Sequence, residues 1–215
     1  MIEKDRERKP PRQDQSHRFL YIGARLAVDF VNSEYSPLSP AAGLQDWEGL
    51  VEFLSGAGVV GPARAVDLLH WRRSAPHVLP GLMQKALRLR AAIRSSFEAR
   101  IARAAIGEAW IEPINDLLRI TEGHDELIWE QGDWRLRFRA REEALEWLLA
   151  AIARSAAEII AEGPEAPVRR CANPDCGLFF YDNSRTKRRR WCLMSVCGNR
   201  SKVAAFARRN PKPRR

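Results

Sequence analysis

The chain has 215 residues, which is enough for one large domain or for a medium-sized domain followed by a small one. Its hydrophobic fraction of 45% is ordinary for a globular protein, and no apolar run approaches the ~18–20 residues that span a bilayer, so we expect no membrane partner. The formal net charge of +9 is unevenly distributed. Residues 168–215 hold 14 Lys and Arg against two acidic residues, whereas residues 1–167 hold 22 against 25. The positive charge therefore belongs to the C-terminal end, where it favours an anionic partner.

Residues 1–17 open the chain with charged side chains and prolines. They contain no apolar stretch that could serve as a signal peptide. We therefore expect a disordered leader on a cytoplasmic protein, which would be associated with the nucleoid if it binds DNA. In a reducing cytosol, paired cysteines are more often metal ligands than disulfides.

Residues 18–163 predict a mainly helical domain with a few short strands. The apolar segment 19–32 is consistent with a short strand that turns at Gly23 into a second strand or a helix. Two β-prone segments, 127–130 and 134–138, flank Gln131-Gly132-Asp133, and apolar and basic residues alternate in the second segment. This pattern predicts a β-hairpin over 127–138. Helical spacing of apolar residues, with capping and breaking residues at the ends, predicts helices over 47–55, 63–73, 81–105, a segment that includes 114–120, and 142–161. In the second of these helices, Val66, Leu69 and Trp71 are expected to face inward.

Two polar residues, Asp29 and Asn32, interrupt the apolar segment 19–32. Such residues commonly cap a helix or close a turn. The alternative interpretation places them in a ligand pocket, through which the N-terminal domain would sense a small-molecule effector. The sequence leaves both interpretations open.

The four cysteines lie in the last quarter of the chain with the spacing C-x4-C-x15-C-x4-C: Cys171, Cys176, Cys192 and Cys197. Two thiol pairs separated by a hairpin-sized segment are typical of a four-thiolate zinc site. Four sulfurs close the coordination tetrahedron, so we expect one structural Zn²⁺ per chain and no metal catalysis. Disulfides would need a secretory context. An iron tetrathiolate would use the same ligands, but C-x2-C pairs are more expected there.

The segments around the cysteines predict a small zinc module with its own fold. Asn173-Pro174-Asp175 can form the tight turn between the first two cysteines, and residues 178–181 can pair with 188–191. Cys197 is expected to open a helix over 198–209, whose amino end favours a bound thiolate. Val203, Phe206 and Ala207 would pack that helix against the hairpin. Knuckle, hairpin and ligand-bearing helix together predict a treble clef.

The predicted fold class is therefore α+β, with a mainly helical N-terminal domain that carries a few short strands, followed by a small treble-clef-like four-cysteine zinc finger. The predicted domains are the leader 1–17, the helical domain 18–163, the finger 168–210 and a basic tail 211–215.

A family resemblance is carried by the run WCLMSVCGNRSKVAAFARR and the preceding CANPDCGLFFYDNSRTKRRR. They resemble the CGNR zinc finger, named for the tetrapeptide that begins here at Cys197. The segment GARLAVDFVNS, residues 23–33, resembles the opening of the ABATE domain, which commonly precedes that finger. The resemblance implies a stress-induced bacterial transcription regulator and makes the four cysteines its zinc ligands. Leu178 stands where the family tends to have an aromatic residue, and Ser33 replaces the usual Thr, but neither is a ligand.

Nine basic residues of the predicted hairpin and final helix are candidate nucleic-acid contacts: Arg185, Lys187, Arg188, Arg189, Arg190, Arg200, Lys202, Arg208 and Arg209. Phosphate contacts from such a surface would give salt-dependent and largely sequence-independent affinity. Because a four-thiolate zinc centre is dianionic, Arg200 could instead neutralise the nearby sulfurs. A solvated basic face without a partner is the remaining alternative.

The leading functional prediction is a zinc-containing, DNA-binding transcription regulator, with DNA favoured over RNA. Its N-terminal domain would sense a ligand or form a homodimer. The alternatives are an RNA-binding or ribosome-associated protein, and a protein-interaction adaptor that uses the basic finger. The sequence contains no Ser-His-Asp arrangement, phosphate-binding glycine loop or H-E-x-x-H motif, so we expect no catalytic residues and no enzymatic activity.

Overall fold

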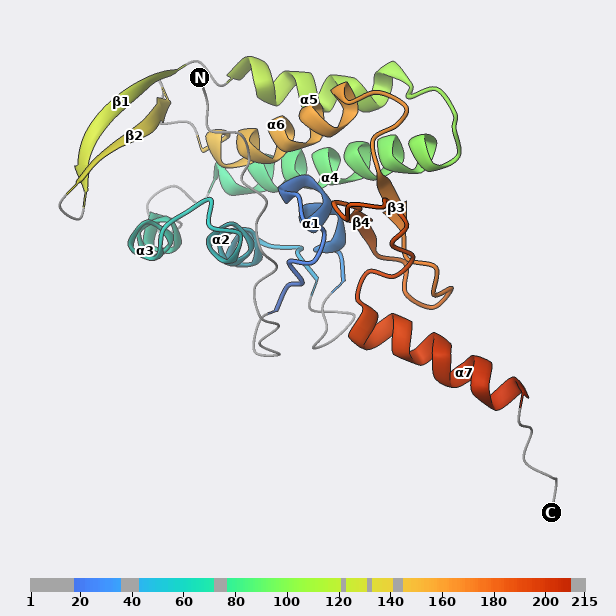
Figure 1. The fold of residues 1–215 in the computed structure, drawn as a ribbon. Coiled ribbons are helices and arrows are strands. Elements are labelled where there is room, and N and C mark those ends of the chain that lie inside the picture. The colour runs from blue at the N-terminus through green and yellow to red at the C-terminus, as the bar shows by residue number, and fades with distance from the viewer. Residues whose placement is uncertain are drawn as a thin grey trace.

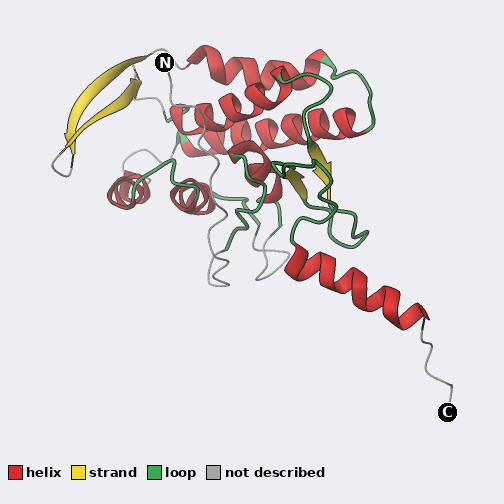
Figure 2. Cartoon of the chain, viewed as in Figure 1, coloured by secondary structure: helices red, strands yellow, loops and turns green. Residues whose placement is uncertain are grey.

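The computed structural model describes residues 18–35, 43–71, 77–120, 123–130, 133–140 and 145–209. The predicted leader 1–17 and tail 211–215 lie outside these residues. A mainly helical body, residues 18–163, is followed by a small C-terminal module, residues 168–209, that contains the four cysteines (Figures 1 and 2). This arrangement confirms the predicted α+β fold class, a mainly helical domain with short strands followed by a small four-cysteine module.

The body consists of helices and one hairpin, whose bounds are α1 Leu26–Asn32, α2 Trp47–Gly56, α3 Pro62–Trp71, α4 Leu79–Ile101, α5 Glu108–Ile120, β1 Gly123–Glu130, β2 Asp133–Ala140 and α6 Trp147–Ala161. Helices α4, α5 and α6 lie side by side, α1 packs against α4 and α6, and α2 pairs with α3 (Figure 1). Within the described part of the chain, no helix combines the length and the apolar character needed to cross a bilayer.

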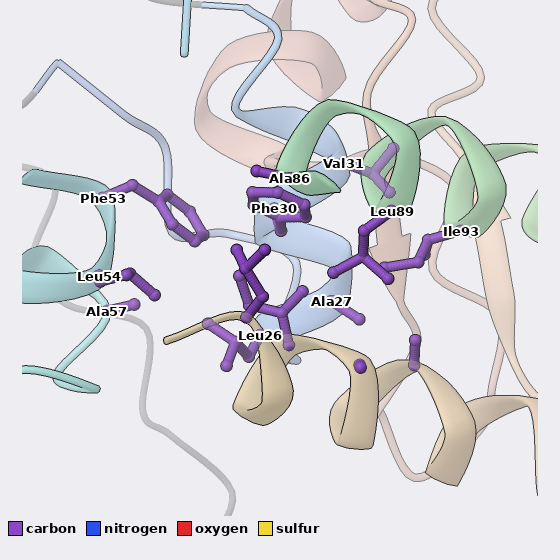
Figure 3. Packing of buried hydrophobic residues seen from close by; sticks show 14 of the residues in the cluster. Leu26, Ala27, Phe30, Val31, Phe53, Leu54, Ala57, Ala86, Leu89 and Ile93 are labelled. Atoms are coloured by element: carbon purple, nitrogen blue, oxygen red, sulfur yellow. The ribbon is translucent and has the colours of Figure 1, made fainter. Parts of the chain in front are cut away.

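The body core is built around the short helix α1, every residue of which is buried. A helix that is apolar on nearly all sides must be surrounded by other elements. Phe30 packs against Phe53 of α2 with ring centroids 5.5 Å apart, and Leu89 and Ile93 of α4 lie on another side (Figure 3). Of the two alternatives for the part after Gly23, the helix is therefore correct, but the short strand predicted before Gly23 is not formed.

Short-range signals predicted α2 and α4 well. The Asp46 side chain accepts a hydrogen bond of 2.7 Å from the Gly49 N–H and caps α2 as expected. All five predicted core positions of α4 are buried: Leu82, Ala86, Leu89, Ile93 and Phe97. Pro80 lies inside the first turn of α4 and does not precede it, which proline tolerates because the first amides of a helix have no intrahelical partner.

The predicted inward face of α3 is wrong for Val66 and Leu69, whereas Trp71 is half-buried and packs against the core as expected. Val66 and Leu69 are 52% and 40% exposed, whereas Leu68 is buried. The Leu68 carbonyl accepts a hydrogen bond of 3.2 Å from the indole of Trp47, so the α3 face that carries Leu68 meets α2. Helix α5 begins at Glu108, contains Pro113 and includes the predicted segment 114–120.

The β1–β2 hairpin confirms the prediction and extends it at both ends. Its strands are antiparallel, and Trp129 lies opposite Trp134 near the end of β1.

The C-terminal module contains a second antiparallel pair, β3 Val168–Arg170 and β4 Phe179–Tyr181. The predicted pairing of residues 178–181 with 188–191 is therefore wrong. One edge of β4 faces β3, and the other faces the body, where the Tyr181 N–H donates to the Gly23 carbonyl at 2.9 Å. Since both edges of β4 are taken, residues 188–191 return without pairing to it.

The module ends with a single π-helical turn, Met194–Gly198, and helix α7, Asn199–Arg209. The predicted helix is confirmed, but its predicted packing against the hairpin is wrong. Helix α7 projects away from the body (Figure 1), and Val203 and Phe206 are each 68% exposed. Ala207 is exposed as well.

Candidate metal centre and basic surface

The four cysteine sulfurs converge on one point of the module. Their Sγ atoms all lie within 4.8 Å of one another. The Sγ of Cys192 is 3.5 Å from that of Cys176 and 3.7 Å from that of Cys197. Cys176 is half-buried and the other three are buried. The four cysteines, which span 26 positions from Cys171 to Cys197, thus form a single sulfur cluster.

The first cysteine pair is brought together by a tight turn. The Cys176 N–H donates to the Asn173 carbonyl at 3.0 Å, which confirms the predicted turn over Asn173-Pro174-Asp175. Gly177 follows with φ of +67°, in the left-handed region that glycine enters without steric cost. The chain then reverses into β4, and the Cys171 N–H donates to the Leu178 carbonyl at 2.8 Å.

The pKa values of three of the cysteines are shifted by their surroundings in a way that a bound metal ion would resolve. Burial raises the pKa of Cys176 to about 11, and it raises the pKa of Cys192 as well. For Cys197 burial acts in the same direction, but hydrogen bonding, first from the Asn173 amide at 3.5 Å, lowers its pKa. A metal ion removes this conflict because it binds thiolates and displaces their protons. Four sulfurs in one tetrahedron-sized cluster fit Zn²⁺, and these cysteines could hold it.

Arg189, and not Arg200, is the basic residue beside the sulfurs. Its guanidinium donates to the Trp191 carbonyl at 2.9 Å, contacts the Cys192 carbonyl, and lies 4.5 Å from the centroid of the Phe180 ring. Arg200 is exposed on α7. Arg200 follows Cys197 closely in sequence, but the helix points its side chain toward solvent.

Asp182 organises the basic loop that joins β4 to the third cysteine, a role that was not predicted from the sequence. It is fully buried, and its carboxylate accepts hydrogen bonds from the Ser184 hydroxyl at 2.5 Å and from the Arg189 N–H at 2.9 Å. Burial alone would raise the pKa of Asp182, but these hydrogen bonds hold it below its ordinary value. A lone acid in a basic run, followed two residues later by Ser, was the available signal.

The predicted nucleic-acid contacts fall into two groups. Arg189 is half-buried and holds the module together, as described above. The other eight are exposed: Arg185, Lys187, Arg188, Arg190, Arg200, Lys202, Arg208 and Arg209. The first four lie on the loop after β4, and the last four on α7.

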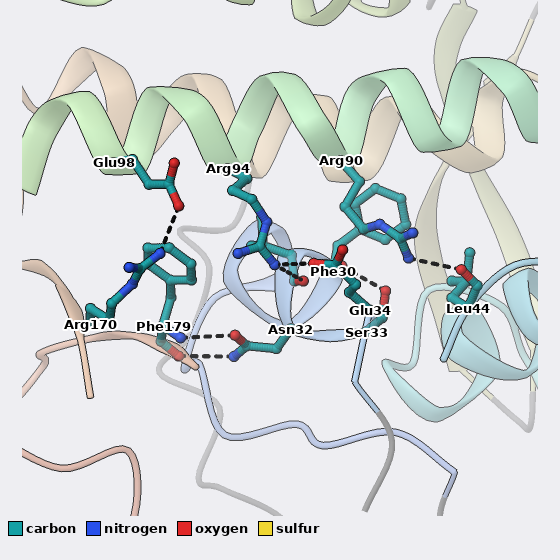
Figure 4. A network of polar contacts seen from close by, with 11 residues as sticks. Phe30, Asn32, Ser33, Glu34, Leu44, Arg90, Arg94, Glu98, Arg170 and Phe179 are labelled. Carbon is teal, nitrogen blue, oxygen red and sulfur yellow. Dashed lines mark hydrogen bonds and ion pairs between the residues drawn. The ribbon is translucent and has the colours of Figure 1, made fainter. Parts of the chain in front are cut away.

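Asn32 and Asp29 lie at the joint between the body and the C-terminal module. The Asn32 amide donates to the Phe179 carbonyl at 2.8 Å and accepts from the Phe179 N–H at 2.9 Å, as a neighbouring strand would (Figure 4). Asp29 accepts a 2.6 Å hydrogen bond from the N–H of Gly23, whose carbonyl binds Tyr181. Both side chains are buried, and neither lines the cavity beside α2 and α3 or the groove beside the linker 163–167. The structure gives these residues a joining role, and a ligand pocket around them stays a prediction.

Charged side chains complete the joint. Arg170 of β3 forms an ion pair of 2.6 Å with Glu98 of α4 and lies over the Phe179 ring (Figure 4). The Tyr181 hydroxyl donates to Glu162 at 2.7 Å. The few residues between α6 and β3 therefore connect two parts that pack together.

Comparison with family models agrees with the two-part structure. The model described as "CGNR zinc finger" matches residues 168–210, and the ABATE model, described as "Putative stress-induced transcription regulator", matches residues 24–163. Comparison with curated proteins found no match. The ABATE match covers more than half of the chain, and the finger match contains the whole sulfur cluster. The protein therefore belongs to the ABATE family and carries a CGNR zinc finger at its C-terminal end.

Proposed function

We propose that the protein is a cytoplasmic, DNA-binding transcription regulator whose C-terminal module holds one structural Zn²⁺ and contacts phosphates. The observation that carries this proposal is the convergence of four sulfurs where a loop and a helix with eight exposed basic residues begin or end. The description of the ABATE family supports regulation of transcription, and hence DNA before RNA. The treble-clef fold of the module stays a prediction.

In this proposal the metal has a structural role. Cys171, Cys176, Cys192 and Cys197 would hold it, and with four protein ligands no position is left for water or substrate. The metal would fix the start of α7 relative to the loop after β4, since Cys197 precedes α7 and Cys192 follows the loop. Asp182 keeps the loop folded, so that Arg185 and Arg188 are presented to solvent. No residue in this arrangement has a catalytic role.

Binding to nucleic acid is tested by titrating the full chain with duplex DNA, single strands and structured RNA at several salt concentrations. With six to eight phosphate contacts, the slope of log K against log salt on duplex DNA is expected to be ~−5 to −7. The double variant Arg185→Gln/Arg188→Gln should reduce this slope by about 2. Salt-independent binding would refute the phosphate contacts, and a strong preference for structured RNA would favour the RNA-binding alternative.

Metal content is tested by elemental analysis of protein purified without chelator. We expect one zinc per chain with four intact thiols. Iron in place of zinc would change the metal but not the structural role, because the ligands are the same.

Effector sensing is the second part of the proposed function. A cavity of about 460 Å³ lies between residues 18–21, α2 and α3, and its walls include Phe19, Tyr21, Val51 and Leu69. Its size and mostly apolar lining suit a small molecule. Thermal-shift screening of the full chain, with Val51→Trp to fill the cavity, would test this site. Homodimer formation is a separate prediction, which analytical ultracentrifugation would test.

A further inference from the structure

A groove of about 770 Å³ lies where the end of α4, the linker after α6 and the C-terminal module meet. Seven Lys and Arg side chains line it against two Glu, an excess of five positive charges. The body, which the sequence analysis found slightly acidic, contributes two of the seven, Arg100 and Arg103. Positive charge lining a concave surface with protein walls focuses the electrostatic potential.

Several of the cations are already engaged within the protein. Arg170 is paired with Glu98 at 2.6 Å, and Arg189 binds carbonyls of its own module. Arg169 lies 3.5 Å from the Asp182 carboxylate, and Arg100 donates to the Ile160 carbonyl at 3.0 Å. These contacts account for the positions of the four side chains, and the Arg170–Glu98 pair among them belongs to the joint. Lys187 is engaged as well, since its Nζ donates to the Asp182 carbonyl at 2.8 Å.

Arg103 and Arg190 differ from these five. Within the described part of the chain, neither side chain forms an ion pair or a hydrogen bond with an acidic residue. Arg103 follows the end of α4 with φ of +55°, a left-handed conformation that is uncommon for a residue with a side chain. Arg190 lies 5.2 Å from the centroid of the Trp191 ring, on the opposite part of the protein. The groove thus has one uncompensated guanidinium from the body and one from the module.

We propose that this groove binds the phosphate backbone of the nucleic acid, so that the ABATE body is a direct part of the nucleic-acid interface. The inference rests on the proposed function and extends it from the module to the body. Two observations favour a long polyanion. Lys187 and Arg190, two exposed residues of the basic loop, also line the groove, so the two basic surfaces are continuous. The unpaired cations also come from two parts of the protein that meet at this groove.

The test compares the double variant Arg103→Gln/Arg190→Gln with the matched control Arg64→Gln/Arg88→Gln. The control removes the same charge from exposed residues of α3 and α4 that do not line the groove. On duplex DNA we expect the groove variant to reduce the salt slope by about 2 and to weaken binding by on the order of tenfold per lost contact at ~100 mM salt. The control should bind within about twofold of the unmodified chain.

The outcomes separate this inference from the proposed function. Unchanged DNA binding by the groove variant, together with weakened binding by Arg185→Gln/Arg188→Gln, would overturn the inference and leave the proposed function standing. An equal loss in the groove variant and in its control would also overturn it, since only net charge would then matter. If the unmodified chain binds no nucleic acid, both fail. Tripolyphosphate serves as a probe for a free phosphorylated ligand. If it raises the melting temperature of the unmodified chain but not that of the groove variant, and DNA binding is the same in both, the groove binds such a ligand and not the nucleic acid.

Discussion

The body and the C-terminal module are stabilised in different ways. The body has a continuous core in which residues of α1, α2, α4 and α6 are almost completely buried. The separate core of the module has six buried residues, and three of them are ligand candidates: Ile22, Leu178, Phe180, Cys171, Cys192 and Cys197. A segment of about 40 residues rarely buries enough apolar surface to fold alone. The module therefore depends on its sulfur cluster and on its contacts with the body.

The dependence between the two parts is mutual but unequal. The body supplies Ile22 to the core of the module and Asn32 to the edge of β4. The module in turn supplies Val168, Phe179 and Tyr181 to the large core. Loss of the module would therefore expose one side of the body core, whereas loss of the body would remove the support of β4.

Of the changes that distinguish the two parts, removal of the metal should have the largest effect. Apparent metal-binding free energies for structural zinc sites are ~10–16 kcal/mol, and in a module with so small a core this is largely folding free energy. We expect Cys192→Ser, or a strong chelator, to abolish zinc binding, order in the module and binding to DNA. Most of the helical structure of the body should remain. Elemental analysis, circular dichroism and limited proteolysis measure these effects.

Ser195→Ala is the control for the cysteine substitution, because Ser195 is exposed between Cys192 and Cys197. It should retain zinc. Complete unfolding of the body on metal removal would contradict the division into two differently stabilised parts.

Weakening the joint between the body and the module should have the second-largest effect. In Asn32→Ala the Phe179 N–H and carbonyl lose their partners inside the protein, at a cost of about 1–3 kcal/mol for each group. Urea unfolding monitored by circular dichroism measures the loss, and faster zinc transfer to a competing chelator would show that the module loosens. Asn199→Ala removes an exposed amide that bonds only the Ser195 carbonyl among the described residues, and it should cost little. Equal costs for the two variants would refute the role of Asn32 in the joint.

What the sequence predicted correctly depends on short-range patterns. The Asp46 cap, the five core positions of α4 and the cysteine spacing can each be recognised within a few turns of chain. The physical causes are local: a cap satisfies amides three residues away, and helical periodicity places residues on one face.

The errors come from choices that distant residues decide. Residues 178–181 could pair with either flanking segment, and the choice was settled by Gly23 and by Asn32, which is 147 positions away from its partner Phe179. The inward face of α3 depends on where α2 lies. Arg189 approaches the sulfurs, and Arg200 does not, because side-chain direction matters more than distance along the sequence.

A matched pair of valines sharpens the comparison at the level of single side chains. Val31→Ala in α1 removes two buried methyl groups and should cost about 2 kcal/mol, from lost transfer free energy and the cavity left behind. Val203→Ala in α7 should change the free energy of unfolding by less than about 0.5 kcal/mol, because Val203 is 68% exposed. Urea unfolding measures both. A large cost at Val203 would mean that α7 is packed in solution, as the sequence had predicted.

The smallest effect is expected from a single charge in the module, at Asp182. Because its hydrogen bonds hold the folded pKa below the ordinary value, the carboxylate contributes stability above its unfolded pKa of ~3.9, and this contribution is lost as the pH falls through the folded pKa. Asp182→Asn keeps the shape of the side chain but removes its charge, so zinc should transfer from the variant to a chelator a few-fold faster than from the unmodified protein. The ratio of the transfer rate of the variant to that of the unmodified protein should stay constant between pH 6 and pH 8, since Asp182 does not titrate there. Thiol protonation affects both proteins alike and cancels in the ratio. A ratio that changes between pH 6 and pH 8 would show that another group, and not this carboxylate, holds the basic loop above the metal.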